Sequence, residues 1–456
     1  MTAWSGRRLH VVGIAGAGMS AYAIVSRALG ATVTGSDRAE SPYLEPVRAA
    51  GIEVVVGHDA ANVPAGDDVE VVVSTAIPAS NPEVVAARER GLGVLSRADL
   101  LAELTREKRT IAVAGAHGKT TTCSMVAHAL LACGLDPAYV IGGTLSTTGT
   151  NAAWGAGEWL VVEADESDRS FLALEVEVAV VTNVELDHHT EWASRHELDE
   201  AFRRFLAAAP RAVLPADDPA VLALREGAAS AAPPAATASA AAATVHFAPW
   251  EGPPLAVPGE HTRRNAAAAL EAAVLAGADR AEAAAALATF RGAGRRFEVL
   301  GETATGACVV DDYAHHPTEV AATIEAAREW ARARPHPHPH PHPGVGRIVA
   351  VFQPHLYSRT HHLAREFGAA LATADVAGVL EVYPARERAE DFPGVTGRLI
   401  AEAAADAGDG KTVLWLPDFA AAERALPPLL REGDVLLALG AGDVDALALR
   451  LVSSPR

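Results

Sequence analysis

Short apolar runs alternate with stretches of helical character along the beginning of the chain. Runs at 9–14, 32–35, 53–56 and 69–74 have the length and composition of buried strands, and helices are expected between them. Strands that alternate with helices are typical of a parallel sheet covered by helices. The segment 95–109, LSRADLLAELTREKR, predicts an amphipathic helix that leads out of this first unit.

The same alternation starts again twice further along the chain. A second unit opens with a strand at 110–115, and a third unit begins near residue 294. A chain of 456 residues is too long for one hydrophobic core, which agrees with several units. We therefore predict an α/β fold with three domains, at 1–107, 108–294 and 295–456. The further strands expected are 159–163, 178–183, 307–312, 347–352, 376–380 and 435–440.

Two stretches of low complexity interrupt this pattern. The alanine-rich segment 226–245 contains prolines and predicts a surface loop. The segment 334–344, RPHPHPHPHPG, alternates histidine with proline. Histidine-rich tracts can bind metal, but alternating prolines hold the backbone extended and leave the coordination geometry undefined. A solvated insertion is the preferred interpretation.

The charge of the chain limits the class of its partners. The formal net charge is −19 and no dense basic patch occurs, which argues against nucleic acid or an anionic membrane as the main partner. An acidic chain that binds phosphates has to bind them locally, through backbone amides, lysine or metal ions.

Cysteines and apolar runs indicate the compartment. Cys123, Cys133 and Cys308 are scattered and form no C-x-x-C pair, so a reducing compartment is expected. The sequence contains no apolar run of about eighteen residues, the length that a membrane-spanning helix needs. We therefore expect a cytoplasmic protein without membrane insertion.

A glycine-rich segment, GIAGAGMSA, follows the apolar run 9–12. Residues 16–21 fit the G-x-G-x-x-G/A phosphate fingerprint. Asp37 lies 21 residues after Gly16, near the usual place of a ribose-binding carboxylate. Taken alone, this pattern would suggest a nicotinamide-dependent dehydrogenase.

A second and different phosphate loop lies in VAGAHGKTTT, at 113–122. The standard P-loop has glycine where Val113 stands, but its essential parts are present. Gly115 and Gly118 free the backbone to wrap phosphate oxygens, Lys119 can reach the β- and γ-phosphates, and the Thr120 hydroxyl can bind Mg²⁺. The helix expected after this loop also favours an anion at its N-terminus.

Acidic residues follow two of the buried strands of the second unit. EADESD (163–168) places Glu163 at one strand end, and TNVELDHHTEW (182–192) follows the next strand. Parallel strands end at the same edge of a sheet, so both groups are expected beside the phosphate loop. A carboxylate and an imidazole there could hold a metal against ATP oxygens. The residues of the second group are Asn183, Glu185, Asp187 and His188.

The order of the motifs along nearly the whole chain resembles that of the Mur ligases. The motifs are GIAGAGMS, STAIPASNPEV, GAHGKTTT, EADESD, TNVELDH, PGEH…NAAAA, GRRFE, DDYAHHPTE, QPHLYSRT and GAGD. The resemblance implies a Rossmann-like N-terminal domain for a UDP-sugar, a central P-loop-like ATPase domain and a Rossmann-like C-terminal domain. The first glycine loop then takes the diphosphate of the UDP-sugar, because chemistry at a helix terminus suits any pyrophosphate.

The resemblance also implies an activity, and it is strongest to the members of the family that use L-alanine. It implies the ATP-dependent joining of L-alanine to the lactyl carboxylate of UDP-N-acetylmuramate, through an acyl phosphate, in peptidoglycan precursor synthesis. ATP and Mg²⁺ are the implied cofactors, and the partners are these two small-molecule substrates.

The resemblance assigns roles to individual residues. Lys119, His188, Glu163, His315 and Arg359 are expected to take part in catalysis, and Thr120, Glu163 and His188 to ligate Mg²⁺. Asn265 is expected at the adenine, Arg296 and Asp312 at ATP, and Tyr313, His315 and Arg359 at the amino acid and the muramyl carboxylate. The phosphate cradle is Gly115, Ala116, His117, Gly118, Lys119, Thr120 and Thr121. The UDP-sugar residues are Gly16, Gly18, Met19, Ser20, Asp37 and Ser74.

Two positions depart from the pattern of the family. Thr262 stands where many members have asparagine, which weakens the expected adenine contact there. Leu356 stands where many members have arginine, so Arg359 is the remaining candidate for the amino-acid carboxylate, and glycine or serine could compete with alanine. For Arg359 and Asp311, a surface ion pair is an alternative interpretation.

Two other functions are left open by the sequence. A ligase that reattaches a recycled murein peptide to the same UDP-sugar would share much of the architecture. It is expected to need a larger acceptor pocket and other motifs in the third domain. A non-enzymatic nucleotide-binding switch would not need the arginine, histidine and tyrosine residues of that domain.

Overall fold

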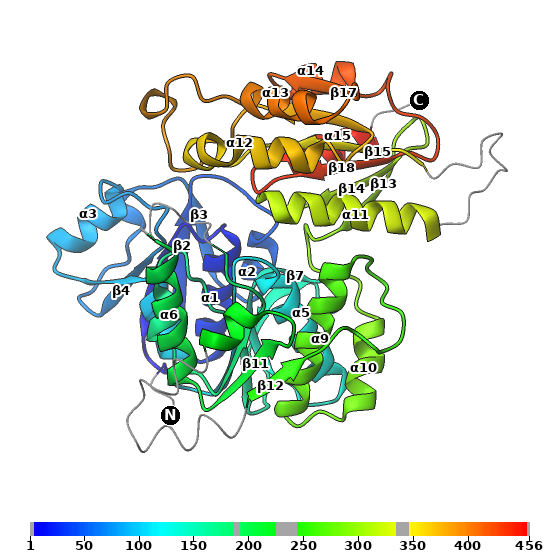
Figure 1. Ribbon diagram of the computed structural model, residues 1–456. Helices are drawn as coiled ribbons and strands as arrows, with labels where there is room; N and C mark the ends of the chain where they lie inside the picture. Colours follow the sequence, from blue (N-terminus) through cyan, green and yellow to red (C-terminus); the bar gives the residue numbers. More distant parts are fainter. Residues whose placement is uncertain (1–3, 186–191, 193, 225–243, 334–345, 454–456) are drawn as a thin grey trace. The chain divides into compact units, whose positions relative to one another are not determined.

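A computed structural model describes residues 4–185, 192, 194–224, 244–333 and 346–453 (Figure 1). The histidine–proline tract lies outside these residues. So does the expected alanine-rich loop, except for its last two residues, which begin a strand. Among the helices that the structure describes, none has both the length and the apolar character that a membrane crossing requires.

The N-terminal domain is built on a five-stranded parallel sheet of order β3-β2-β1-β4-β5. The four expected strands are confirmed, with ends that differ by at most two residues. The expected helix 95–109 is wrong at both ends, because its first residues complete strand β5 and the helix itself stops at Leu104. The strands are β1 (Arg8–Val12), β2 (Thr32–Asp37), β3 (Glu53–Val56), β4 (Val69–Val73) and β5 (Gly93–Ser96). The helices are α1 (Ala17–Ala28), α2 (Leu44–Ala49), α3 (Pro82–Glu89) and α4 (Arg97–Leu104), with a 3₁₀ turn η1 (Ala60–Asn62).

The central domain carries a seven-stranded sheet of order β12-β11-β10-β6-β9-β7-β8. Strand β6 lies between β10 and β9, and all three run parallel. Only the β7–β8 pair is antiparallel among the described strands of this sheet. The strands are β6 (Arg109–Ala114), β7 (Ala138–Leu145), β8 (Thr150–Ala153), β9 (Trp159–Glu163), β10 (Val178–Val181), β11 (Arg211–Pro215) and β12 (Thr244–Phe247). The helical elements are α5 (Lys119–Ala132), η2 (Ser170–Ala173), α6 (Arg195–Ala208), α9 (Glu260–Leu275) and α10 (Arg280–Ala288).

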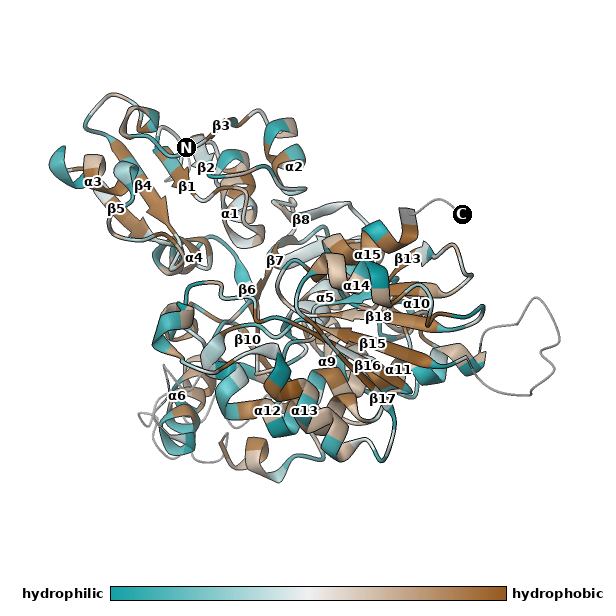
Figure 2. Cartoon of the chain, turned by 90° about the horizontal axis from the view of Figure 1, so that it is seen from above, coloured by the Kyte–Doolittle hydropathy of each residue, from teal (hydrophilic) through white to brown (hydrophobic). Residues whose placement is uncertain are grey.

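The C-terminal domain has a six-stranded sheet of order β13-β14-β18-β15-β16-β17, in which β13 runs antiparallel to β14. Alternate residues of its strands pack on opposite faces. One set meets α11, α12 and α13, and the other meets α14 and α15. Strands β15, β16 and β18 are correspondingly brown in Figure 2. The strands are β13 (Glu298–Glu302), β14 (Cys308–Asp312), β15 (Ile348–Phe352), β16 (Val376–Leu380), β17 (Thr412–Leu416) and β18 (Val435–Leu439). The helical elements are α11 (Pro317–Ala333), α12 (Tyr357–Leu371), η4 (Ala389–Asp391), α13 (Gly397–Ala407), α14 (Phe419–Ala425) and α15 (Val444–Ser453).

The three-domain α/β fold expected from the sequence is confirmed. By their internal contacts the first two domains form one compact unit, residues 1–256 and 264–291, and the remaining residues form a second. In the first unit, α1 of the N-terminal domain packs against β7 and β8 of the central domain. The boundaries placed at 107 and 294 stay predictions.

Candidate active site

The first glycine loop lies at the carboxyl end of β1, between the ends of β2 and β4. Gly13 adopts a left-handed backbone, and its carbonyl accepts a hydrogen bond from the Gly16 amide. Asp37 at the end of β2 braces the loop, because its carboxylate accepts a hydrogen bond from the Ala15 amide at 2.9 Å. Helix α1 begins at Ala17, so its first amides stand at the mouth of this loop.

The expected UDP-sugar residues lie around this loop, but some of them can offer a ligand only their backbone. Gly18 has space beside it, since a methyl group there would lie 3.8 Å from its nearest neighbour. The side chains of Met19 and Ser20 are buried, and the Ser20 hydroxyl contacts the Ala17 carbonyl and Asn151. Ser74 follows β4. Backbone amides, rather than the side chains of Met19 and Ser20, are therefore the groups this helix offers to an anion.

The second glycine loop follows β6, and α5 begins at Lys119. Gly115 and Gly118 both have left-handed φ values, +136° and +80°. A side chain at Gly115 would collide with Thr182, and a methyl group at Gly118 would lie only 2.5 Å from Oδ1 of Asn265. Both positions therefore require glycine, and the backbone of the loop is free of side chains where it would enclose a phosphate.

Residues that follow β10 hold this loop in place. Asn183 Oδ1 accepts a hydrogen bond from the His117 amide at 3.1 Å, and Asn183 Nδ2 donates to the His117 carbonyl at 2.9 Å. The Thr182 hydroxyl donates to the same carbonyl at 2.6 Å. The His117 ring lies 3.2 Å from Glu185. The two motifs GAHGKTTT and TNVELDH thus meet, as the parallel strand order predicts.

Lys119 forms a buried ion pair with Glu166. Its Nζ donates to both carboxylate oxygens, at 2.9 and 3.1 Å, and to the Gly115 carbonyl at 2.7 Å. Burial acts to lower the pKa of Lys119, but Glu166 and its acidic neighbours outweigh burial and raise that pKa. Burial raises the pKa of Glu166. Glu166 is absent from the set expected on sequence, although it belongs to the EADESD motif.

The other carboxylates of EADESD have partners of their own. Asp165 and Asp168 pair with Nη2 of Arg97, the first residue of α4, at 3.4 and 2.9 Å. Burial opposes ionisation of Asp165, but Lys119 and Arg97 hold its pKa below the usual value. Glu163 accepts a hydrogen bond from the Gly142 amide at 2.6 Å. Among the described residues, Glu163 is the one carboxylate of the motif that pairs with no cation.

The donor set beside the loop suits a magnesium ion. Glu163 supplies a carboxylate without a cationic partner, and within the described part of the chain the Thr120 hydroxyl forms no hydrogen bond. Oxygen donors of these two kinds are the ones that Mg²⁺ prefers. His188, the third expected ligand, and Asp187 lie outside the described residues. The residues that can be described fit the ion, and the role of His188 stays a prediction.

Asn265 lies on α9 and is buried against Gly118. The structure therefore places this expected adenine residue beside the phosphate loop. Thr262, one helical turn earlier, donates its hydroxyl to the Pro258 carbonyl at 2.8 Å. Its side chain thereby serves the start of the helix, which is a structural role for the position that departs from the family pattern.

Asp312 ends β14 and is enclosed by its own domain. One carboxylate oxygen accepts a hydrogen bond from the Phe297 amide at 2.8 Å, and the other accepts from the Ala314 amide at 2.8 Å. Burial raises its pKa. Arg296 lies 3.6 Å from Glu319 and over the ring of Tyr313. Asp312 therefore holds together two segments, the one before β13 that carries Arg296 and the one after β14 that carries Tyr313.

The expected amino-acid residues Tyr313, His315 and Arg359 are brought together in the C-terminal domain. The His315 ring is 2.9 Å from the Tyr313 carbonyl, and its centre lies 6.1 Å from that of His355. Arg359 Nη1 lies 3.5 Å from the ring of His355, which stacks on Tyr383. His355 links the group and is missing from the expected set, although it belongs to the motif QPHLYSRT.

Two alternatives weighed on sequence have structural answers. Arg359 is only 7% exposed, so its side chain does not lie on the surface. Asp311 does form an ion pair, with Arg295 at 3.1 Å, but it is buried, and burial raises its pKa to about 7. Leu356 is buried at the start of α12 with a φ of +73°, so the backbone at this position is strained.

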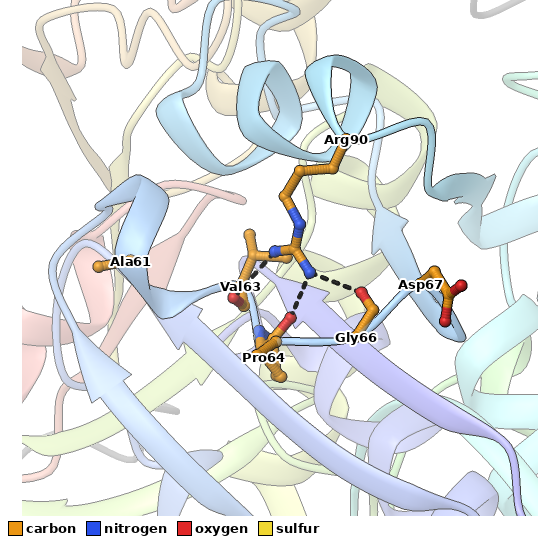
Figure 3. A pocket seen from close by; sticks show the side chains of 7 residues that line it. Ala61, Val63, Pro64, Gly66, Asp67 and Arg90 are labelled. Carbon is orange, nitrogen blue, oxygen red and sulfur yellow. Dashed lines mark hydrogen bonds between the residues drawn. The ribbon is translucent and has the colours of Figure 1, made fainter.

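A surface hollow in the N-terminal domain involves none of the expected site residues. Arg90, at the end of α3, reaches across it and donates to the carbonyls of Val63, Pro64 and Gly66 at 3.2, 2.7 and 2.7 Å (Figure 3). The guanidinium is thus engaged in holding the loop after η1, which is a structural role.

Comparisons with known proteins cover nearly the whole chain. Three family models match: "Mur ligase family, catalytic domain" over residues 8–109, "Mur ligase middle domain" over 113–273, and "Mur ligase, glutamate ligase domain" over 295–442. A UDP-N-acetylmuramate–L-alanine ligase of Rubrobacter xylanophilus is 43% identical over 98% of this chain and 99% of its own. The enzyme of that name from Kineococcus radiotolerans is 47% identical over 96% and 94%. The crystal structure of UDP-N-acetylmuramate-alanine ligase from Thermotoga maritima matches with a TM-score of 0.77 and 28% identity, over 98% of both chains.

Proposed function

The chain belongs to the Mur ligase family, and from this premise we propose that it joins L-alanine to the lactyl carboxylate of UDP-N-acetylmuramate, with conversion of ATP to ADP and phosphate. The observation that carries the proposal is the full-length similarity to enzymes of that name at 43% and 47% identity. The reaction would serve peptidoglycan precursor synthesis in the cytoplasm.

The reaction requires activation of a carboxylate. Its charge repels an amine, and oxide is too poor a leaving group to depart. A carboxylate oxygen therefore attacks the γ-phosphorus of ATP, the bond to the β–γ bridging oxygen breaks, and ADP leaves. The amine of alanine then attacks the acyl carbon, phosphate departs with the carbon–oxygen electron pair, and the amine loses its proton. Positioning and stabilisation of charge are what the protein has to supply.

The second glycine loop is proposed to bind the nucleotide phosphates. The backbone of Gly115–Thr121 would enclose them, and Lys119 would stabilise charge on the β- and γ-phosphates. Thr120, Glu163 and His188 would hold a Mg²⁺ ion, which would neutralise phosphate charge. The lack of side chains at Gly115 and Gly118 supports this assignment. Asn265 would contact the nucleotide, and Arg296 and Asp312 would act on it from the C-terminal domain.

The first glycine loop is proposed to bind the diphosphate of the UDP-sugar. The amides that open α1 would bind the phosphate oxygens, since Gly16 and Gly18 allow close approach. Asp37 would both brace the loop and face the ribose, and Ser74 would complete the site from the adjacent strand end. The hydrogen bond between Asp37 and the Ala15 amide supports the first of these roles.

The group around His355 is proposed to bind the amino acid. Arg359 would pair with its carboxylate, because a buried guanidinium binds carboxylates well and the position of Leu356 offers no second cation. Tyr313 and His315 would line the amine and the muramyl carboxylate. One methyl group discriminates by only about 1–3 kcal/mol, so glycine and L-serine should be weak acceptors beside L-alanine.

Release of phosphate tests the proposal. The purified protein is given ATP, Mg²⁺ and UDP-N-acetylmuramate, with L-alanine, glycine, L-serine or a murein peptide in turn. The proposal expects the highest kcat/KM with L-alanine. Release only with the peptide would replace it by the recycling ligase, and binding of ATP without acceptor-dependent release would replace it by a nucleotide switch.

A further inference from the structure

The ion pair of Lys119 and Glu166 uses the one lysine of the phosphate loop. Both partners are largely buried, with side chains 15% and 4% exposed, and both carboxylate oxygens contact Nζ. The phosphates of a nucleotide would need the same ammonium group. The protein itself thus provides this lysine with an anion.

Lys119 is the partner that can move. Glu166 is held by its surroundings, because its side chain is enclosed and its carbonyl accepts a hydrogen bond from the Trp192 indole at 3.2 Å. Lysine has a flexible four-carbon stem and a point charge that can be directed to a new partner. An exchange of partners would therefore turn Lys119 away from Glu166 and toward the phosphates.

Glu166 is distinguished from the neighbouring carboxylates by this contact. Asp165 and Asp168 are engaged by Arg97, and Glu163 by the Gly142 amide. Neutralising Asp168 removes one negative charge from the same short segment without touching the lysine. That residue consequently offers a matched control for the general effect of charge.

We propose that Glu166 is the resting counter-ion of Lys119 and competes with the β- and γ-phosphates of the nucleotide for it. Glu166 is a positioning residue, since it acts through the lysine. The inference rests on the proposed function only for the assignment of Lys119 to the phosphates. This role explains why a buried carboxylate lies beside a site for a polyanion. Glu166 keeps the lysine charged and ordered until the phosphates replace the carboxylate.

Binding of ADP without divalent metal separates this role from metal binding. Calorimetry in the presence of a chelator compares the full-length protein with Glu166→Gln and Asp168→Asn. Removal of the competing anion should tighten ADP binding about tenfold in Glu166→Gln, as expected when a close charge pair no longer has to be broken. Asp168→Asn should change it by less than about twofold, since the charge of Asp168 is offset by Arg97 and reaches Lys119 only through longer-range, screened interaction. Glu166→Asp, which keeps the charge on a shorter side chain, should fall between wild type and Glu166→Gln.

AMP provides the second arm, because it lacks the β-phosphate that Lys119 is proposed to hold. The gain in Glu166→Gln should disappear with AMP. In turnover, the variant should show a lower KM for ATP without a higher kcat. Weaker or unchanged ADP binding in Glu166→Gln, an equal gain in Asp168→Asn, or an equal gain with AMP would each overturn the proposal. None of these binding measurements uses the UDP-sugar or an amino acid. If the ligase assay failed, the binding measurements would still test the role of Glu166.

Discussion

The two glycine loops of the first compact unit share a backbone plan. Each follows a strand with neighbours on both sides, β1 in one sheet and β6 in the other, and each opens a helix, α1 or α5. Each is braced by a polar side chain from an adjacent strand end. Asp37 binds the Ala15 amide in the first loop, and Asn183 binds the His117 amide in the second.

The two loops differ in the charges that their own residues carry. The segment Gly13–Ala21 contains no charged residue, whereas the second loop carries Lys119 and lies beside Thr120 and Glu163. Backbone amides at a helix start are sufficient to bind a phosphate. Transfer of a phosphoryl group needs a cation and metal ligands as well. A glycine fingerprint therefore identifies a place for phosphate, and the neighbouring side chains determine the chemistry.

Removal of Lys119 should separate the loops most strongly. In Lys119→Met, turnover of ATP should fall by about 10³-fold or more, because the transferring phosphoryl group loses its cation, while binding of UDP stays unchanged. Steady-state formation of ADP measures the first effect and calorimetry with UDP the second. Because the substitution leaves Glu166 buried without its partner, Lys119→Met/Glu166→Gln serves as the folded control in thermal melting. Near-normal turnover in a folded variant would contradict the assignment.

Loss of the carboxylate of Glu163 should affect the second loop alone. Glu163→Gln should raise the Mg²⁺ concentration needed for half-maximal turnover by about tenfold or more, the scale of loss seen when even an outer partner of a metal ligand is removed. Titration of turnover with Mg²⁺ measures the shift. Asp168→Asn, which neutralises a carboxylate engaged by Arg97, is the matched control. Coinciding titration curves for wild type and Glu163→Gln would remove Glu163 from the metal site.

Alanine in place of glycine should act with opposite sign on the stability of the two loops. Gly118→Ala should lower the free energy of unfolding by about 1–3 kcal/mol, since φ is +80° and the methyl group would meet Asn265. Gly18→Ala should leave it unchanged or raise it by up to about 1 kcal/mol, because the residue is in a helix and a methyl group would fit there in van der Waals contact with Arg97. Denaturant unfolding followed by a probe of the first compact unit measures both. Equal losses would show that the loops are built more alike than the φ angles indicate.

Removal of Asp37 or Asn183, the braces of the two loops, should weaken binding only of the ligand of that loop. Asp37→Ala should weaken binding of UDP about three- to tenfold and leave ADP unaffected, while Asn183→Ala should do the reverse, on the scale of one hydrogen bond. Calorimetry with both ligands on both variants completes the test. A variant that weakens both ligands equally would indicate general unfolding rather than a local brace.

The fold could be predicted where strands are short apolar runs. Runs 159–163 and 376–380 coincide with strands whose apolar residues are buried on both faces. The run 53–56 coincides with the exposed edge strand β3, because three successive valines favour a strand. The strand expected at 178–183 ends earlier in the structure, at Val181, because Thr182 and Asn183 turn to the phosphate loop. The edge strand β13 was missed because glutamate and glycine interrupt its apolar residues, which exposure to solvent permits.

The motifs that form the site could be predicted from the sequence, but the contacts between individual site residues could not. Lys119 and Thr120 follow from the order of strand, glycine loop and helix. The choice of Glu166 rather than Asp165 as the partner of Lys119 depends on how EADESD turns after β9, which no local pattern specifies. The burial of Arg359 and its link to His355 likewise depend on packing in the C-terminal domain.

In the proposed reaction, the substrate carboxylate is phosphorylated before the amide forms. UDP-N-acetylmuramate labelled with ¹⁸O in both oxygens of its lactyl carboxylate tests it most directly, with mass analysis of the phosphate released in the presence of ATP, Mg²⁺ and L-alanine. An acyl phosphate requires that one labelled oxygen leave with each phosphate while the other stays in the amide. Phosphate without the label, formed together with the alanyl product, would contradict the account.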